Sequence, residues 1–198
     1  MNLRTAEKKR KTRETDISLC LTIQEYGAPG QFTGTTGVGF FDHMITSFCV
    51  HGGFSVSLTM TGDTCVDCHQ SVEDFGIVLG QAFAEILGDR SGIRRFGDSY
   101  VPMDETLGFC AVDLCGRGYS VCDIAYTSPK TGEYDNQMTR EFFRAFAMNI
   151  GAALHVRVLY GANDHHKTEA AFKACARALA EAVSPIRNGV VLSSKGSL

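Results

Sequence analysis

Hydrophobic and polar positions along the chain follow two periods, which predicts a mixed α and β protein. Period-two alternation in "DISLCLTI" (16–23) and "FSVSLTMTG" (54–62) predicts strands. Apolar residues at helical spacing predict helices in "FFDHMITSFCVHG" (40–52) and from residue 69 to near "GDRSG" (88–92). The basic run at residues 8–13 is interpreted as a solvent-exposed edge strand that precedes the first of these strands.

The second half of the chain repeats this order of elements. Strands are predicted for "TLGFCAVDLCG" (106–116), "YSVCDIAY" (119–126) and "LHVRVLYG" (154–161), and helices for "REFFRAFAMNIGAA" (140–153) and the segment that starts at residue 165. We therefore predict one domain built by internal duplication, with halves of about residues 1–92 and 93–198. The expected fold class is α+β, in which each half lays two helices on one face of a mostly antiparallel sheet.

Each predicted long helix begins with a histidine that is followed four residues later by a glutamate. Residues at i and i+4 share one face of a helix, so each pair can bind one divalent ion. The repetition of this pair at equivalent places in both halves favours ligand pairs over surface residues. The candidate ligands are His69 and Glu73 in the first half and His165 and Glu169 in the second.

Two further observations extend the candidate site. Adjacent helix residues point about 100° apart, so His165 and His166 are not expected to bind the same ion. Their pairing therefore predicts two metal centres. His43 of the first half aligns with Glu141 of the second, and both are metal-capable side chains.

Composition narrows the class of protein. The chain has 198 residues, of which 44% are apolar and 21% charged, as in an ordinary globular domain. No apolar run approaches the roughly 18 residues of a membrane helix, and the N-terminal residues do not resemble a secretory signal. The net charge of −3 argues against a nucleic-acid binder. The basic run at residues 8–13 leaves a nucleic-acid-binding module open as an alternative. Salt-sensitive binding to DNA or RNA that is lost on deletion of residues 1–13 would support it.

The eight cysteines are scattered through apolar patterns, which favours buried free thiols in a reducing compartment over a disulfide framework. "CVDC" (65–68) has the spacing of a zinc or redox pair. Because the chain has no second such pair, we do not expect a zinc ribbon.

Six blocks in order resemble the imidazoleglycerol-phosphate dehydratase family: "GVGFFDHM", "VEDFGIVLGQAF", "GIRRFGDSYVPMDETL", "VDLCGRGY", "NDHHKTEAAFKACARALAEA" and "SSKGSL". The resemblance runs from about Arg4 to the C-terminus. It implies the fold of the second domain of ribosomal protein S5, a cytoplasmic location and a large homo-oligomer, a 24-mer in this family. It also implies two Mn²⁺ ions held between subunits, with no nucleic-acid or membrane partner.

The resemblance also implies which residues bind metal. Gln70 stands where the family has a second consecutive histidine, Glu141 where many members have histidine, and Cys68 where aspartate is common. A glutamine oxygen is a weaker ligand that Mn²⁺ still accepts. We expect one ion on His69 and Glu73 with His166, and a more loosely bound one on His165 and Glu169 with Gln70. The implied metal ligands are His43, His69, Gln70, Glu73, Glu141, His165, His166 and Glu169.

The family's reaction removes water from imidazole glycerol phosphate to give imidazole acetol phosphate in histidine biosynthesis, which makes it a carbon–oxygen hydro-lyase. By resemblance, Glu14 contacts substrate and transfers the C–H proton, with His43, Glu73 and Glu169 also in the catalytic set. From the residues alone, Glu14 would be an exposed strand charge. The implied phosphate-binding residues are Arg95, Arg117, Lys173, Ser193, Ser194 and Lys195. The alternative is a catalytically weakened paralogue that binds metal or phosphorylated ligands, and Gln70 favours it.

Overall fold

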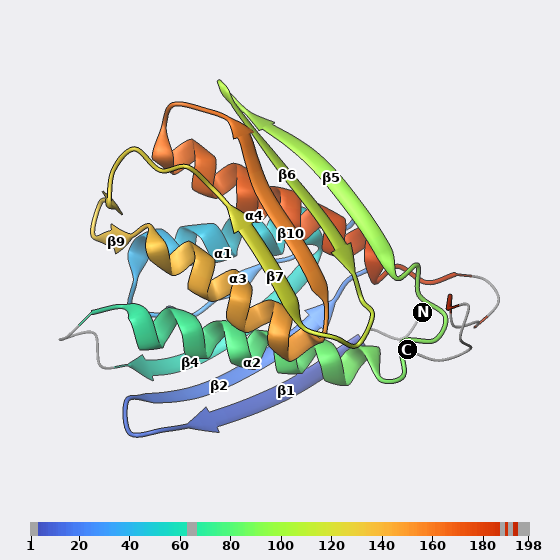
Figure 1. Ribbon diagram of the computed structural model, residues 1–198. Helices are drawn as coiled ribbons and strands as arrows, with labels where there is room; N and C mark the ends of the chain where they lie inside the picture. Colours follow the sequence, from blue (N-terminus) through green and yellow to red (C-terminus); the bar gives the residue numbers. More distant parts are fainter. Residues whose placement is uncertain (1–3, 63–66, 187–188, 190–191, 194–198) are drawn as a thin grey trace.

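The computed structural model describes residues 4–62, 67–186, 189 and 192–193. Two four-stranded sheets form the outer layers of the molecule, and the long helices lie between them (Figure 1). This arrangement confirms the α+β fold class expected from the alternation of strand and helix periods.

The first half contributes one sheet and two helices. Its strand order is β1-β2-β4-β3, in which β1, β2 and β4 pair antiparallel and β3 pairs parallel to β4. The elements are β1 (Arg4–Lys11), β2 (Thr15–Ile23), β3 (Phe32–Thr33), α1 (Gly39–Gly52), β4 (Phe54–Gly62) and α2 (His69–Leu87).

The second half repeats this topology. Its strand order is β5-β6-β10-β7, with β5, β6 and β10 antiparallel and β7 parallel to β10. A short hairpin of β8 (Lys130–Thr131) and β9 (Tyr134–Asp135) is inserted before α3. The other elements are β5 (Phe96–Met103), β6 (Thr106–Asp113), β7 (Tyr119–Asp123), α3 (Gln137–Ile150), β10 (Ala153–Tyr160) and α4 (Asp164–Ala182). The matched strand orders confirm the duplication.

Details of the elements differ from the sequence prediction. Strand β5 was not predicted, because its exposed positions and Pro102 weaken the strand pattern. Pro102 is tolerated in β5 because β5 is an edge strand of its sheet. Helix α3 begins and ends three residues earlier than predicted. It ends because Gly151 adopts a left-handed conformation with φ 70°, just as Gly53 (φ 68°) ends α1.

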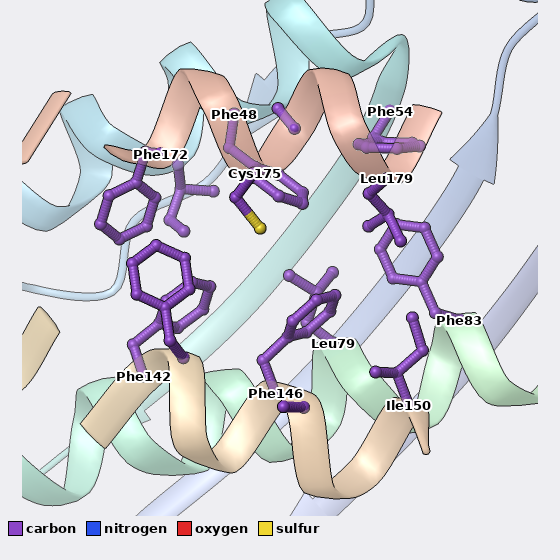
Figure 2. Close-up of a cluster of buried hydrophobic side chains, with 14 of the residues drawn as sticks. Phe48, Phe54, Leu79, Phe83, Phe142, Phe146, Ile150, Phe172, Cys175 and Leu179 are labelled. Atoms are coloured by element: carbon purple, nitrogen blue, oxygen red, sulfur yellow. The ribbon is translucent and has the colours of Figure 1, made fainter. Parts of the chain in front are cut away.

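The core lies between the helices, where aromatic side chains of both halves meet. Figure 2 shows Phe142 and Phe146 of α3 pointing toward Phe172 and Leu179 of α4. The Phe142 and Phe172 rings stack with their centroids 5.1 Å apart. This shared core fixes the two halves against each other, and the four long helices are positioned by it.

The pairing of helices places the candidate residues. Helix α1 packs on α4, and α2 packs on α3. His69 is the first residue of α2 and His165 the second of α4, so each candidate histidine lies in a first helical turn and its glutamate follows one turn later. His43 and Glu141 are each the fifth residue of α1 and α3, respectively. Within the described residues, none of the helices combines the length and apolar character needed to cross a membrane.

Candidate metal centre and active site

Three metal-capable side chains converge where α1 meets the start of α4, and we call this group the α1–α4 cluster. Glu169 Oε2 lies 3.3 Å from His43 Nε2 and 3.1 Å from His165 Nε2. One donor atom of each residue lies within 4.8 Å of the other two. Among the described residues, no other set of three or more His, Cys, Asp or Glu side chains meets that spacing. Two imidazoles and a carboxylate so close together fit a single divalent ion.

The α4 cap holds the histidine of this cluster in place. Asn163 accepts hydrogen bonds through Oδ1 from the backbone N–H groups of His165 (2.9 Å) and His166 (3.4 Å). An asparagine at this position satisfies two of the unpaired donors at the helix start. The Phe40 ring packs edge-on against the His165 ring, with centroids 5.2 Å apart. The imidazole is therefore fixed by both a cap and a ring contact.

The glutamate of the α1–α4 cluster is buried and carries a compensating cation. Glu169 is 6% exposed, and its Oε1 lies 2.6 Å from Lys173 Nζ and 3.5 Å from the Ser47 hydroxyl. Burial alone would raise the pKa of Glu169, but the hydrogen bond and charge of Lys173, helped by His43 and His165, lower it. Glu169 is thus kept ionised, as a metal ligand must be.

The equivalent group on α2 and α3, the α2–α3 cluster, consists of His69, Glu73 and Glu141. His69 Nε2 lies 3.6 Å from Glu73 Oε2. The Arg144 guanidinium joins the two carboxylates, with Nη2 3.2 Å from Glu73 Oε1 and Nε 3.0 Å from Glu141 Oε2. This cluster therefore has one imidazole and two carboxylates, where the α1–α4 cluster has two imidazoles and one carboxylate.

The residues that directly follow His165 and His69 along the chain are His166 and Gln70, and neither is part of the α1–α4 or the α2–α3 cluster as defined above. His166 Nδ1 is 2.8 Å from Glu105 Oε2, and Gln70 is exposed on the first turn of α2. The hydrogen bond that His166 donates to the Glu105 carboxylate raises the pKa of His166. The backbone N–H of Asn163, with His166, holds the pKa of the Glu105 carboxyl well below its usual range. His166 therefore contacts the turn between β5 and β6, whereas Gln70 is exposed on α2.

Glu14 lies exposed in the turn between β1 and β2, where its N–H donates to the Thr12 hydroxyl (3.1 Å). The next residue, Thr15, is buried and donates its hydroxyl hydrogen to Asp74 Oδ2 (2.5 Å). Asp74 also pairs with Arg10 of β1 (2.9 Å). The buried Asp74 follows Glu73 on α2, so these contacts tie the turn that carries Glu14 to the helix of the α2–α3 cluster.

Arg95 lies just before β5 and is already paired. Its guanidinium forms a two-pronged contact with Asp113 (2.7 and 3.1 Å) and donates to the Leu192 carbonyl. It also lies 4.7 Å above the Phe96 ring. The hydrogen bond to Asp113 raises the pKa of Arg95. A phosphate bound by Arg95 would have to share the guanidinium with Asp113.

The other phosphate candidates are distributed over the chain. Lys173 contacts Glu169, which places one of these cations at the α1–α4 cluster. Arg117 is exposed between β6 and β7. Ser193 is a described residue that has a contact of its own, and Ser194 and Lys195 lie outside the described residues. The seven cysteines among the described residues are free thiols; Cys65 of the "CVDC" pair lies outside that part of the chain.

Sequence reasoning missed three residues that contact the candidate ligands or their helices: Glu105, Arg144 and Asp74. Arg144 follows Glu141 by three residues, a helical spacing that brings side chains together and could have indicated the pair. Glu105 is part of the "MDETL" segment, but its contact with His166 spans 61 positions. That contact depends on tertiary structure and had no local signal.

Comparison with known proteins shows which family the chain belongs to. The family model described as "Imidazoleglycerol-phosphate dehydratase" matches residues 36–179. The chain belongs to the imidazoleglycerol-phosphate dehydratase family. Curated dehydratases of this name from Listeria welshimeri and Phenylobacterium zucineum are 50% and 49% identical, over 99% and 98% of this chain and 100% and 99% of theirs.

Solved structures of the family have the same fold. The Staphylococcus aureus dehydratase is 35% identical and has a TM-score of 0.81, covering 92% of this chain and 99% of its own. The Pyrococcus furiosus dehydratase, solved in complex with (S)-C348, is 32% identical with a TM-score of 0.80, covering 96% and 100%. As a dehydratase of this family, the protein is a hydro-lyase of histidine biosynthesis whose substrate is a phosphorylated imidazole. The family is metal-dependent, and the α1–α4 cluster offers a donor set that fits an ion.

Proposed function

We propose that this protein dehydrates imidazole glycerol phosphate to imidazole acetol phosphate with Mn²⁺ bound at two centres. The observation that carries this proposal is the convergence of His43, His165 and Glu169 within 4.8 Å, at the start of a helix that also carries Lys173. Imidazole and carboxylate together suit Mn²⁺. A cation one turn further along α4 suits the phosphate of the substrate.

Each centre would combine ligands from two subunits. His43, His165 and Glu169 would take their further ligand from Gln70 of a neighbouring subunit, because within one chain Gln70 belongs to the α2–α3 pair whereas this cluster lies on the α1–α4 pair. The α2–α3 cluster, His69, Glu73 and Glu141, would likewise be completed by His166 of a neighbour. Neighbouring helix positions diverge by about 100°, so one chain cannot direct both members of either pair to one ion. This sharing supports assembly into a large homo-oligomer, which we propose to be a 24-mer.

The bound ions would supply positive charge to the imidazole ring and to the oxygen that leaves as water. The protein's own groups would then move the proton. Glu14 would remove the hydrogen from the carbon next to the one that loses its hydroxyl, giving an enol that becomes the ketone. Glu14 fits this role because its carboxylate is exposed in a turn that Asp74 ties to α2. His43, Glu73 and Glu169 would orient the substrate through the centres that they form.

The phosphate would be bound by fixed cations and hydroxyls. Lys173 lies beside the α1–α4 cluster, and Arg95 is held rigidly by Asp113, so both are pre-positioned. Arg117, Ser193, Ser194 and Lys195 complete the proposed set. We also propose that the enzyme acts in the cytoplasm, since its relatives serve amino-acid biosynthesis and the described cysteines are free thiols.

A dehydration assay on imidazole glycerol phosphate tests this proposal, with Glu14→Gln as the decisive variant. Glu14→Gln should abolish most turnover while leaving Mn²⁺ content unchanged, because Glu14 is not a proposed ligand. The matched control is Glu133→Gln, an exposed glutamate in the β8–β9 turn, which should behave as the wild type. Near-normal turnover of Glu14→Gln would remove Glu14 from the mechanism.

The alternative function is a weakened paralogue that binds metal or phosphorylated ligands with little turnover, and the observation that favours it is Gln70. A neutral amide oxygen gives less charge and less affinity than an imidazole for most transition ions. Gln70→His separates the two functions. A large gain in turnover over a nearly inactive wild type would support the paralogue, whereas a fully active wild type would exclude it.

A further inference from the structure

The turn between β5 and β6 brings a carboxylate against one of the proposed metal ligands. Asp104 and Glu105 form this turn, and Asp104 adopts φ 48°, in the left-handed region. The Glu105 side chain reaches the loop that precedes α4. It thereby connects two elements that are far apart in the sequence but adjacent in the second half of the fold.

Both oxygens of Glu105 are engaged. Oε1 accepts hydrogen bonds from the backbone N–H groups of Ala162 (2.9 Å) and Asn163 (2.8 Å), and from the Thr106 hydroxyl (3.0 Å). Oε2 lies 2.8 Å from His166 Nδ1. An ionised carboxylate can only accept, so Nδ1 of His166 must carry the hydrogen of this contact. In the neutral imidazole this leaves the lone pair on Nε2, the form that a metal ligand requires.

We propose that Glu105 is a positioning residue that fixes the tautomer and the ring orientation of His166, so that His166 binds metal through Nε2. The inference rests on the proposed function, in which His166 completes the α2–α3 cluster of a neighbouring subunit. Carboxylates that accept from the second nitrogen of a ligating histidine are a recurrent device in metal sites. The same network reaches the other centre, because Asn163 donates to Glu105 and also caps His165.

The duplicated fold supplies an independent argument. Glu105 directly precedes Thr106, the first residue of the second strand of its half, just as Glu14 precedes Thr15 in the first half. The residue equivalent to His166 in the first half is Gln70. Duplication has therefore placed a glutamate at the same turn twice. In the second half that glutamate is bonded to a histidine, while Glu14 is exposed and free to meet a substrate.

Glu105→Gln tests this inference because it keeps the shape of the side chain but replaces one accepting carboxylate oxygen with a donating amide nitrogen. The amide oxygen can still accept from Ala162 and Asn163, but the amide nitrogen would now donate to His166 Nδ1. That contact would leave the hydrogen on Nε2, which then cannot bind metal. The matched control is Glu133→Gln, which makes the same change at an exposed glutamate in the β8–β9 turn.

Binding of Mn²⁺ to the full-length, assembled protein is measured by calorimetry and by the electron paramagnetic resonance signal of the free ion. Glu105→Gln should weaken one of the bound ions by roughly 10- to 100-fold and leave the other nearly unchanged. Glu133→Gln should match the wild type. Unchanged Mn²⁺ affinity in Glu105→Gln, with weaker binding in His166→Ala, would overturn the positioning role and leave the proposed function intact.

The double variant separates positioning from a structural role. In the His166→Ala background, Glu105→Gln should cause no further loss of Mn²⁺ affinity, because its only route to the metal is gone. Additive losses would overturn the inference, as would a Glu105→Gln chain that unfolds at a much lower temperature than Glu133→Gln. If the wild type itself binds no Mn²⁺, then the proposed function fails and the inference fails with it.

Discussion

Gly80 of α2 offers the sharpest test of how closely the two halves pack. A Cβ at this position would lie 2.8 Å from Asn149 Cβ, 2.8 Å from the Phe146 carbonyl oxygen and 3.0 Å from the Ile150 backbone nitrogen. Two of these atoms belong to the α3 backbone, which cannot rotate aside. Gly80→Ala would therefore push α3 away from α2 by roughly half an ångström to restore ordinary van der Waals separation.

Two opposing effects determine how much Gly80→Ala changes the free energy of unfolding. Inserting a methyl group into a packed interface costs about 1–3 kcal/mol, whereas replacing a helical glycine by alanine returns about 0.5–1 kcal/mol. The net expectation is a loss of about 0–2.5 kcal/mol in the free energy of unfolding, centred on about 1 kcal/mol. For a chain of this length, each 1 kcal/mol lost corresponds to a melting temperature lower by roughly 2–4 °C.

The assay is urea and thermal unfolding of metal-free protein at a fixed concentration, followed by circular dichroism. Gly39→Ala in α1 is the control, because a Cβ at Gly39 meets nothing within 4 Å. Gly39→Ala should be neutral or slightly stabilising. A Gly80→Ala protein as stable as Gly39→Ala would refute the close approach of α2 and α3, and with it the positioning of Glu73 beside Glu141.

Three further predictions concern the anchoring of the site and its metal. Asp74→Asn should lower the free energy of unfolding by about 1–3 kcal/mol in urea, because it weakens the bonds to Thr15 and Arg10; unchanged stability would contradict the anchoring role. Glu169→Gln should weaken one bound Mn²⁺ by roughly tenfold or more in a calorimetric titration, since metal sites require an ionised carboxylate; two ions bound as in the wild type would exclude Glu169 as a ligand. Mn²⁺ at about 100 times its dissociation constant should stabilise the protein by about 2.7 kcal/mol per site, seen as a melting temperature that falls on chelation; a temperature insensitive to chelator would count against both clusters.

The sequence predicted the repeated elements of the fold because each buries one face and so carries a clear period. The strand over residues 16–23 and the helix over 40–52 are examples, and both are present as β2 and α1. Strand β5 escaped prediction because it is an edge strand whose alternate positions are exposed. The parallel pairing of β7 with β10 was also not predicted, since pairing partners depend on long-range contacts that leave no mark in local sequence.

Part of the candidate site could also be predicted from the sequence, and part could not. The pair of His165 and Glu169 could be predicted because a helix brings positions four apart onto one face. The duplication also aligned His43 with Glu141 as metal-capable side chains, and the structure brings His43 to the same Glu169 oxygen. The contacts of Arg144 with Glu73 and of Glu105 with His166 join separate elements, so only the folded chain reveals them.

Duplication followed by divergence explains why the two clusters are not chemically equal. Helices α1 and α4 supply two imidazoles and one carboxylate, whereas α2 and α3 supply one imidazole and two carboxylates with Arg144 between them. In the proposed assembly the first cluster would gain the neutral amide of Gln70, and the second would gain the imidazole of His166. The second centre would then hold two anionic ligands against one in the first. Because Mn²⁺ is bound more strongly by anionic oxygen and by imidazole than by a neutral amide, a difference in affinity between the two centres would follow from Gln70 in the first half and Glu141 in the second.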